Sequence, residues 1–427
     1  MTSTSDTQRI GGPARYLSIL GNNELVALLG ARLLSGIGDQ AARAVLALYV
    51  LESHGGALLT SLVLAISYVP STFGFLALGS LADRFPRRNV MLVADLARGV
   101  LIGVMAIAVY ASAELWIVLG LLLVAELFSA PAYSAQSALL PDAARTPSEY
   151  QAVVGLGATF DQVVQVAGFI IGGIAVGLTS AGFALLFDSV TFFISFLMIL
   201  AFVLPRVLQT KPGTSLNRMW RDAKGGLRTI VRTPSIRAVV VLLWASAALL
   251  VATDAVALPY AALHGAEPWV STTLLAATPA GAAVGALLVA RLPIRRQLQL
   301  LFPLAIGSTV PMLMTAIQPA LLLAAVLWFA VGLCQGYVVT LMAISVQITP
   351  GERRGRVYGV AGAGFNAMAI VGLLGLGALA DLTSPAAAVV LAGALGLLVF
   401  LLAALLWPQR DVRSAIRVSY GANSRSF

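Results

Sequence analysis

The chain has 427 residues, of which 59% are hydrophobic and 11% are charged, and its mean hydropathy is +0.92. A soluble protein carries roughly 25% charged residues, so this little charge could not cover a water-facing surface. The composition therefore excludes a disordered chain, a disulfide-rich secreted scaffold and a soluble enzyme. Because the apolar stretches are continuous, the sequence predicts an all-α integral membrane protein.

Hydropathy predicts twelve transmembrane helices, each long enough to cross a hydrocarbon core of about 30 Å. In chain order the predicted spans are 25–50, 57–82, 89–111, 115–138, 151–178, 182–204, 236–262, 268–290, 297–317, 320–348, 356–381 and 386–407. They imply five regions, which are a cytoplasmic N-terminal tail (1–24), a six-helix bundle (25–204), a cytoplasmic basic interdomain loop (205–235), a second six-helix bundle (236–407) and a cytoplasmic C-terminal tail (408–427).

Basic residues alternate between the predicted loops. Basic residues follow spans 2, 4, 6, 8 and 10, whereas the alternate loops contain neither lysine nor arginine, at 52–56, 111–114, 179–182, 264–268, 318–319 and 381–385. Cytoplasmic loops carry an excess of basic residues, so we expect both termini in the cytoplasm. The same rule accounts for the net charge of +9 without nucleic acid as a partner. The strong preference for arginine over lysine is typical of a GC-rich bacterium, and we expect a bacterial cytoplasmic (inner) membrane location.

The only long loop, 205–235, contains a basic segment around Trp220 and Arg228. Its pattern predicts an amphipathic helix on the inner leaflet, where membrane lipids would bind it. The segment also tethers the two predicted bundles. We expect both roles.

The chain repeats itself. A charged motif follows span 2 and is echoed after span 8, as Ala82-Asp83-Arg84-Phe85-Pro86-Arg87-Arg88 and Ala290-Arg291-Leu292-Pro293-Ile294-Arg295-Arg296. The only histidines, His54 and His264, follow spans 1 and 7. These echoes predict two pseudo-symmetric six-helix bundles, which can rock about a central site and give alternating access.

The motif after span 2 carries a family resemblance. Gly79-Ser80-Leu81-Ala82-Asp83-Arg84-Phe85-Pro86-Arg87-Arg88 resembles the signature Gly-x-Leu-Ala-Asp-Arg-x-Gly-Arg-Arg of the major facilitator superfamily, with Pro86 in place of a glycine. Further stretches resemble the branch of the enterobactin exporter and the macrolide efflux proteins, among them 32–39, 95–98, 128–132 and 347–350. The resemblance implies the twelve-helix fold of that superfamily and a secondary transporter.

The resemblance also implies a conformational-switch motif made of Gly79, Asp83, Arg84, Arg87 and Arg88. In the family, the aspartate meets the end of a facing helix in the outward-open state. A carboxylate near a helix N-terminus is favourable because of the helix dipole. The alternative is that the loop is a topology signal only, which explains the arginines but not Asp83.

Two family signatures are incomplete. The helix-5 antiporter signature is replaced by 164–173, which keeps Gly168, Gly172 and Gly173 but lacks the proline. We expect the glycines to allow close helix packing. Span 4 contains Glu126 and lacks the arginine of proton antiporters, so proton coupling would need another route.

Five ionisable residues lie deep in the first predicted bundle, namely Asp39, Arg43, Arg98, Glu126 and Asp161. Asp39 and Arg43 share a helix face, so we predict the pairs Asp39–Arg43 and Arg98–Glu126. Asp161 would then be unpaired, and an unpaired carboxyl in a low dielectric can take up the coupling proton. The alternative is that these residues form structural ion pairs that hold the bundle together.

Other charged residues have weaker assignments. Asp254 is the only acid deep in the second half, and it could contact the substrate or form an outer gate. We interpret Asp188 as structural and expect Arg32 to extend towards the inner interface. Candidate cavity residues are Tyr68, Phe73, Phe128, Tyr133, Trp244, Tyr260, Trp328, Tyr337, Gln136, Gln165, Gln335 and Asn366.

No phosphate-binding loop, metal-ligand spacing or nucleophile elbow occurs in the sequence, so we expect neither an enzyme nor a cofactor. The predicted function is export of a small amphipathic substrate (a drug, antibiotic or siderophore), driven by the proton gradient, by a protein that we expect to be monomeric. Uptake or facilitated diffusion is an alternative. A third possibility is a transporter-like protein without solute flux, such as a lipid scramblase.

Overall fold

The computed structural model describes residues 19–72, 85–206 and 216–408, and every regular element in these ranges is a helix. The first half contains α2 (Asn23–His54), α3 (Ala57–Ile66), α6 (Arg87–Tyr110), α7 (Leu115–Leu127), α8 (Ser129–Ala143), α9 (Pro147–Leu178) and α10 (Ala181–Phe202). After α11 (Leu216–Arg232), the second half contains α12 (Pro234–Leu250), α13 (Ala252–Leu263), α14 (Pro268–Ala290), α15 (Ile294–Met314), α16 (Leu321–Cys334), α17 (Tyr337–Gln347), α18 (Arg354–Leu382) and α19 (Pro385–Leu406).

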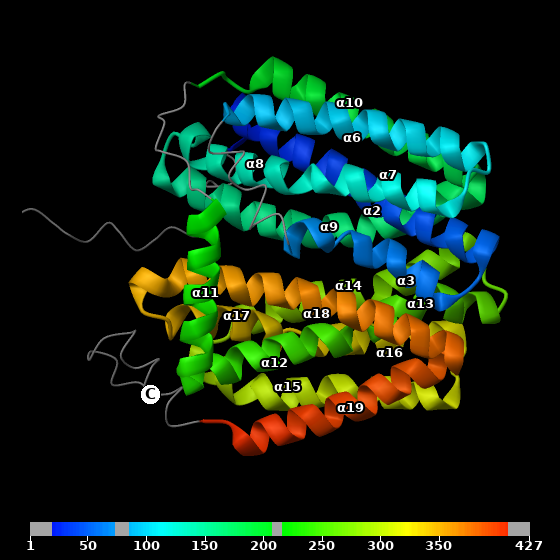
Figure 1. Cartoon of the computed structure of the whole chain (residues 1–427), viewed down its shortest axis with the longest axis vertical. Coiled ribbons are helices and arrows are strands. Elements are labelled where there is room, and N and C mark those ends of the chain that lie inside the picture. Colours follow the sequence, from blue (N-terminus) through cyan, green and yellow to red (C-terminus); the bar gives the residue numbers. More distant parts are fainter. Residues whose placement is uncertain (1–18, 73–84, 207–215, 409–427) are drawn as a thin grey trace, which may run out of the picture.

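The helices form two groups that lie side by side (Figure 1). Helices α2–α10 make the first bundle and α12–α19 make the second, while α11 crosses the ends of the second bundle. We call the end at which α2 meets α3 the outer end, because its loops lack arginine, and the end that carries α11 the inner end. Figure 1 shows the outer end on the right.

Ten helical runs in the described residues are long and apolar enough to cross a membrane. They correspond to ten of the twelve predicted spans. Span 1 is the 32-residue helix α2, which carries Arg32, Asp39 and Arg43 along its length. Span 2 begins with the apolar helix α3, and its second half falls largely in residues 73–84, outside the described ranges.

Several helices begin where a polar side chain can accept hydrogen bonds from the first turn. The side chains of Asn22, Thr146, Ser180 and Ser384 accept from backbone N–H groups at the starts of α2, α9, α10 and α19. Proline follows the cap in α9 and α19, where its missing N–H costs nothing. The turns between spans are therefore encoded locally.

Within the described residues, four predicted spans are each interrupted between helical segments. The breaks fall at Ser67 in span 2, at Phe128 in span 4, at Val251 in span 7 and at Gln335 in span 10. At Phe128 the N–H bonds to the carbonyl of Ala125, three residues back, and Gln335 makes the same short bond to Gly332. Hydropathy could not predict these breaks, because the apolar character continues across them.

The two bundles contact each other near the outer end. Gly377 of α18 lies against Ser61 of α3, and the Ser61 hydroxyl donates a 3.0 Å hydrogen bond to the carbonyl of Ala255 in α13. A Cβ atom on Gly173 of α9 would lie 3.0 Å from the carbonyl oxygen of Pro268 in α14. Glycine and serine thus let three helix pairs approach closely across the interface.

The predicted helix in the interdomain loop is present as α11. Its Asp222 forms a 2.8 Å ion pair with Arg356 of α18, and its Gly226 lies against the backbone of Arg356. Trp220 remains exposed. The helix therefore docks on the second bundle through one face and leaves an aromatic residue free at the inner end.

Candidate functional site

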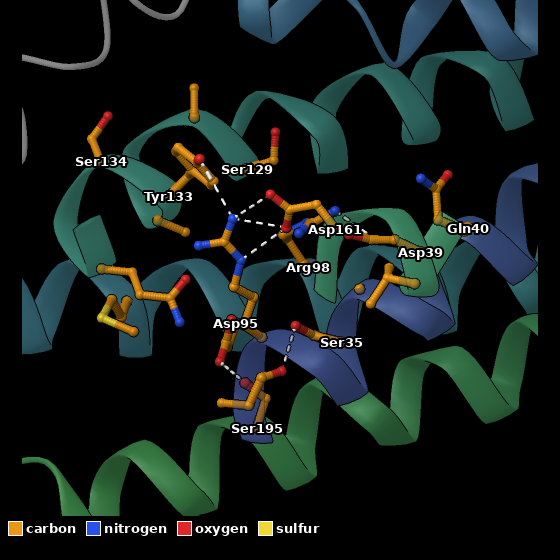
Figure 2. A pocket seen from close by; sticks show the side chains of 18 of the residues that line it. Ser35, Asp39, Gln40, Asp95, Arg98, Ser129, Tyr133, Ser134, Asp161 and Ser195 are labelled. Carbon is orange, nitrogen blue, oxygen red and sulfur yellow. Dashed lines mark hydrogen bonds and ion pairs between the residues drawn. The ribbon is translucent and has the colours of Figure 1, made fainter. Parts of the chain in front are cut away.

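A cavity of about 460 Å³ opens among the helices of the first bundle. Side chains from α2, α6, α8, α9 and α10 line it, together with Asn366 of α18 in the second bundle. Figure 2 shows acids, an arginine and several serines converging on this space. The charged residues of the lining are Arg32, Asp39, Arg43, Asp95, Arg98 and Asp161. The first bundle therefore supplies nearly all of the polar surface.

Asp161 is not unpaired, which contradicts the sequence-based prediction. The guanidinium of Arg32 donates hydrogen bonds to both of its carboxylate oxygens, at 2.7 Å for the Nη2 contacts and 3.0 Å for Nε. Arg32 also stacks over the ring of Tyr133, 4.8 Å from its centre. The expectation that Arg32 extends towards the interface was therefore wrong, because a carboxylate from α9 holds it in the cavity wall.

Of the other two predicted ion pairs, Arg98–Glu126 is present at a long distance, whereas Asp39 and Arg43 each have another partner. Arg98 Nη2 of α6 donates to Asp39 Oδ1 of α2 at 2.6 Å. Arg43 of α2 instead reaches Glu126 of α7, with Nη2 and Nε at 2.8 and 3.0 Å from Oε1. Arg98 lies 3.8 Å from the second oxygen of Glu126. The prediction of an Asp39–Arg43 pair, which rested on helix spacing, failed because these two side chains point at neighbouring helices rather than along their own.

Glycines bring α9 close to α2 beside this network. A Cβ atom on Gly172 would lie 2.6 Å from the carbonyl oxygen of Ala41, and one on Gly168 would lie 2.8 Å from that of Ile37. Gly173 instead faces α14 across the bundle interface. The glycine stretch therefore serves two contacts, one that sets the position of Asp39 and one between the bundles.

A second cavity of about 290 Å³ lies between the bundles. Gln40, Arg43 and Gln165 line it from the first bundle, and Asp254 and Asn366 line it from the second. One oxygen of Asp254, Oδ1, is buried without a hydrogen-bond partner among the described residues. Asp254 thus lies in the wall of the cavity between the bundles.

Part of the conformational-switch motif is described. Gly79, Asp83 and Arg84 lie outside the described residues. Arg87 donates hydrogen bonds to the carbonyl of Ala138 at 2.7 Å and to Asp142 at 2.6 Å, both in α8. Arg88 donates to the carbonyl of Leu200 in α10 at 2.7 Å. These two arginines hold the start of α6 against its neighbours.

The aromatic candidates divide between cavity and core. Tyr68 and Tyr133 line cavities, as do Gln136, Gln165 and Asn366. Tyr260, Trp328 and Tyr337 are fully buried in the core of the second bundle, so their assignment to the cavity was wrong. Phe73 lies outside the described residues.

Sequence reasoning missed Asp95 and Ser195 as site residues. The Ser195 hydroxyl of α10 donates a 2.6 Å hydrogen bond to Asp95 of α6, and both residues line the cavity of about 460 Å³ in the first bundle (Figure 2). The signals for Asp95 were its place in the stretch 95–98, which resembles the exporter branch, and its position one helical turn before Arg98. Ser195 had none, since a serine in a membrane helix is common.

Comparison with known proteins identifies the class. The family model described as Major Facilitator Superfamily matches residues 28–347 and 317–425. This chain therefore belongs to the Major Facilitator Superfamily, and it is a multi-pass membrane transporter of that type.

Two relatives align with most of the chain. The "Multidrug efflux pump Tap" of Mycolicibacterium fortuitum is 27% identical over 373 residues, which cover 84% of this chain and 89% of the relative. The "Uncharacterized MFS-type transporter YfiS" of Bacillus subtilis (strain 168) is also 27% identical, over 393 residues that cover 88% and 92% of the two chains.

Solved structures share the fold. The nucleoside transporter NupG superimposes with a TM-score of 0.70 at 11% identity and covers 90% of this chain and 99% of its own. The bacterial homologue of the lysosomal transporter Spinster, in its inward-facing and unoccupied conformation, has a TM-score of 0.62 at 13% identity and covers 96% and 98%. At this identity the likeness concerns the fold alone.

Proposed function

We propose that this transporter exports an amphipathic small molecule from the cell by alternating access, in exchange for protons. The alignment with a multidrug efflux pump along most of the chain supports export. The observation that carries the coupling is the set of three arginine–carboxylate pairs within the first bundle, of which Arg43–Glu126 and Arg98–Asp39 are largely buried and Arg32–Asp161 faces the cavity. Buried ionisable groups in a membrane protein are costly and mark substrate or proton pathways.

The cavities suit a substrate that is partly apolar. Serine, glutamine and asparagine side chains alternate with apolar ones along their walls, and each arginine on the wall already has a carboxylate partner. A phosphorylated sugar would need free arginines for its phosphate. A bulky amphipathic compound needs only apolar contact and a few hydrogen bonds.

The contacts at the outer end favour an inward-open resting state in the proposed cycle. When the outer end is closed, the cavities can be reached only from the inner end, and a substrate for export would enter there. Proton binding and release in the arginine–carboxylate network would then change the balance between the inward-open and the outward-open conformations.

Sealed vesicles that contain the purified protein test this function. We expect a fluorescent amphipathic dye such as ethidium to move against its gradient when a pH gradient is imposed, and to stop when the gradient is collapsed. Asp39→Asn should reduce this flux to that of empty vesicles. Glu52→Gln removes a carboxylate at the exposed outer end of α2 and should leave the flux unchanged.

Two results would contradict the proposal. Dye flux that ignores the pH gradient would make the protein a facilitator. Lipid exchange between leaflets without any solute flux would make it a scramblase-like protein.

A further inference from the structure

The first bundle contains more acids than arginines within its predicted spans. There the described residues include three arginines, Arg32, Arg43 and Arg98, against five acids, Asp39, Asp95, Glu126, Asp161 and Asp188. Three of the acids form the ion pairs described above. Asp95 and Asp188 remain, and neither has an arginine within ion-pair distance.

These two acids differ in their surroundings. Asp95 lies on the cavity wall and accepts a hydrogen bond from the hydroxyl of Ser195. Asp188 does not line the cavity and is only 1% exposed. Its Oδ1 accepts a 3.2 Å hydrogen bond from Thr191, one turn along its own helix, and its Oδ2 has no partner among the described residues.

Asp188 is enclosed between helices. Its Oδ1 occupies the space that a side chain on Gly38 of α2 would fill. The charged groups that face it are Asp39 from α2, Arg98 from α6 and Glu126 from α7. From α9, Asp161 is turned away to Arg32. An ionised carboxylate in this dry space, next to two other acids, would have no partner to offset the loss of water.

We propose that Asp188 is the proton-carrying acid of this protein and that it exchanges its proton with Asp39 through a movement of Arg98. Arg98 is suited to this movement because Nη2 makes its short contact to Asp39 while Nε is buried without a partner. When Arg98 turns to Asp188, the O–H bond of Asp188 breaks and the new carboxylate forms the ion pair. Asp39, which Arg98 has left, takes up the proton that Asp188 releases, so one O–H bond breaks, one forms and the charge of the group is conserved.

Asp188 gives up the proton in this step and Asp39 receives it, and the two acids differ in their access to the cavity. Asp188 is in the outer half of α10, eight positions into a helix that begins at Ala181, and is closed off from the cavity. Asp39 lines the cavity, and its side chain is 17% exposed there. A proton that arrives at Asp188 from the outer end would therefore be released through Asp39. This direction rests on the proposed function, whereas the protonation of Asp188 does not.

Infrared spectroscopy of the purified protein in nanodiscs tests the protonation directly, because a protonated carboxyl has a C=O band apart from that of a carboxylate. At neutral pH we expect a protonated-carboxyl band that Asp188→Asn removes and Asp95→Asn retains. If Asp188→Asn does not fold, Thr191→Val removes the hydrogen bond to the carboxyl and should shift the same band. A band that none of the Asp188 and Thr191 variants alters, or that Asp95→Asn removes, would refute the proposal.

The exchange has its own test. Asp39→Asn mimics protonated Asp39, so Arg98 should turn to Asp188 and the Asp188 band should disappear at the same pH. Persistence of the band in that variant would refute the exchange. Neither measurement uses substrate or a gradient. A failed transport assay would therefore leave this result standing, and a failed infrared result would leave proton-coupled export to be tested by vesicle flux.

Discussion

The carboxylate of Asp381, in the last turn of α18, caps the first turn of α3 in the opposite bundle. Its two oxygens accept hydrogen bonds from the backbone N–H of Ala57 at 2.5 Å and of Leu58 at 3.0 Å. The first N–H groups of a helix have no partner within the helix. Gly56, which precedes α3 with a φ of 85°, has no side chain that could supply one. Asp381 therefore ties the two bundles together at the outer end.

Removal of this cap should favour opening of the outer end. A lost N-cap costs about 1 kcal/mol, so Asp381→Ala should shift the balance between closed and open states about fivefold. Spin labels at His54→Cys and Leu382→Cys, in a Cys334→Ser background, would report the distance between the bundles. We expect a larger population of long distances. Glu52→Ala, which removes another acid at this end, is the control, and identical distance distributions for all three proteins would show that Asp381 is not a latch.

The glycine contact between α9 and α14 gives a matched pair of variants. Gly173→Ala places a methyl group against Thr272 and Pro268 of α14, whereas Gly177→Ala, one turn further along α9, meets no atom within 4 Å. Overpacking costs about 1–3 kcal/mol. Only Gly173→Ala should destabilise the conformation that is closed at the outer end by this amount. The same spin labels should therefore show opening in Gly173→Ala alone. Equal distances in the two variants would mean that α14 can move aside without cost.

The sequence predicted the helices better than their side-chain partners. Hydropathy located the helical runs, because an apolar stretch is a local property of the chain. Capping residues such as Thr146 and Ser180, which the structure shows at the starts of α9 and α10, are a local signal that the hydropathy boundaries did not use. The break at Phe128 was not predictable in this way. It depends on a shortened backbone hydrogen bond inside an uninterrupted apolar segment.

In the candidate site too, the sequence predicted which residues matter better than it predicted their partners. The charged residues of the first bundle were identified, because charge within an apolar run is visible in the sequence. Their pairing was wrong for Asp39 and Asp161, since Arg98 and Arg32 reach them from positions that only helix crossing determines. Asp188 was interpreted as structural because the sequence shows neither its missing partner nor its position against Gly38.

The loss of stability should differ between variants that remove Asp39 and variants that remove Arg98 from their ion pair. Arg98→Gln leaves Asp39 beside Glu126 and Asp188 without its ion-pair partner, and the loss of one partner from a buried ion pair costs about 3–5 kcal/mol. After Asp39→Asn, Arg98 keeps Glu126 at 3.8 Å and can turn to Asp188, so the cost should be well below that. Thermal unfolding of the detergent-solubilised variants measures the difference. Equal losses of stability would show that Arg98 has no second acid to turn to.

A last comparison separates a carboxylate on the cavity wall from one that holds helices together. The side chain of Asp161 is 47% exposed in its pair with Arg32, whereas that of Glu126 is 3% exposed in its pair with Arg43. Exposed pairs contribute below about 1 kcal/mol, so Asp161→Asn should unfold almost as the wild type does and should lower the apparent affinity for the dye. Glu126→Gln leaves Arg43 buried without its partner and should cost about 3–5 kcal/mol. Thermal unfolding and the dependence of flux on dye concentration measure the two effects. A large loss of stability in Asp161→Asn, with unchanged affinity, would place that residue among the structural pairs instead.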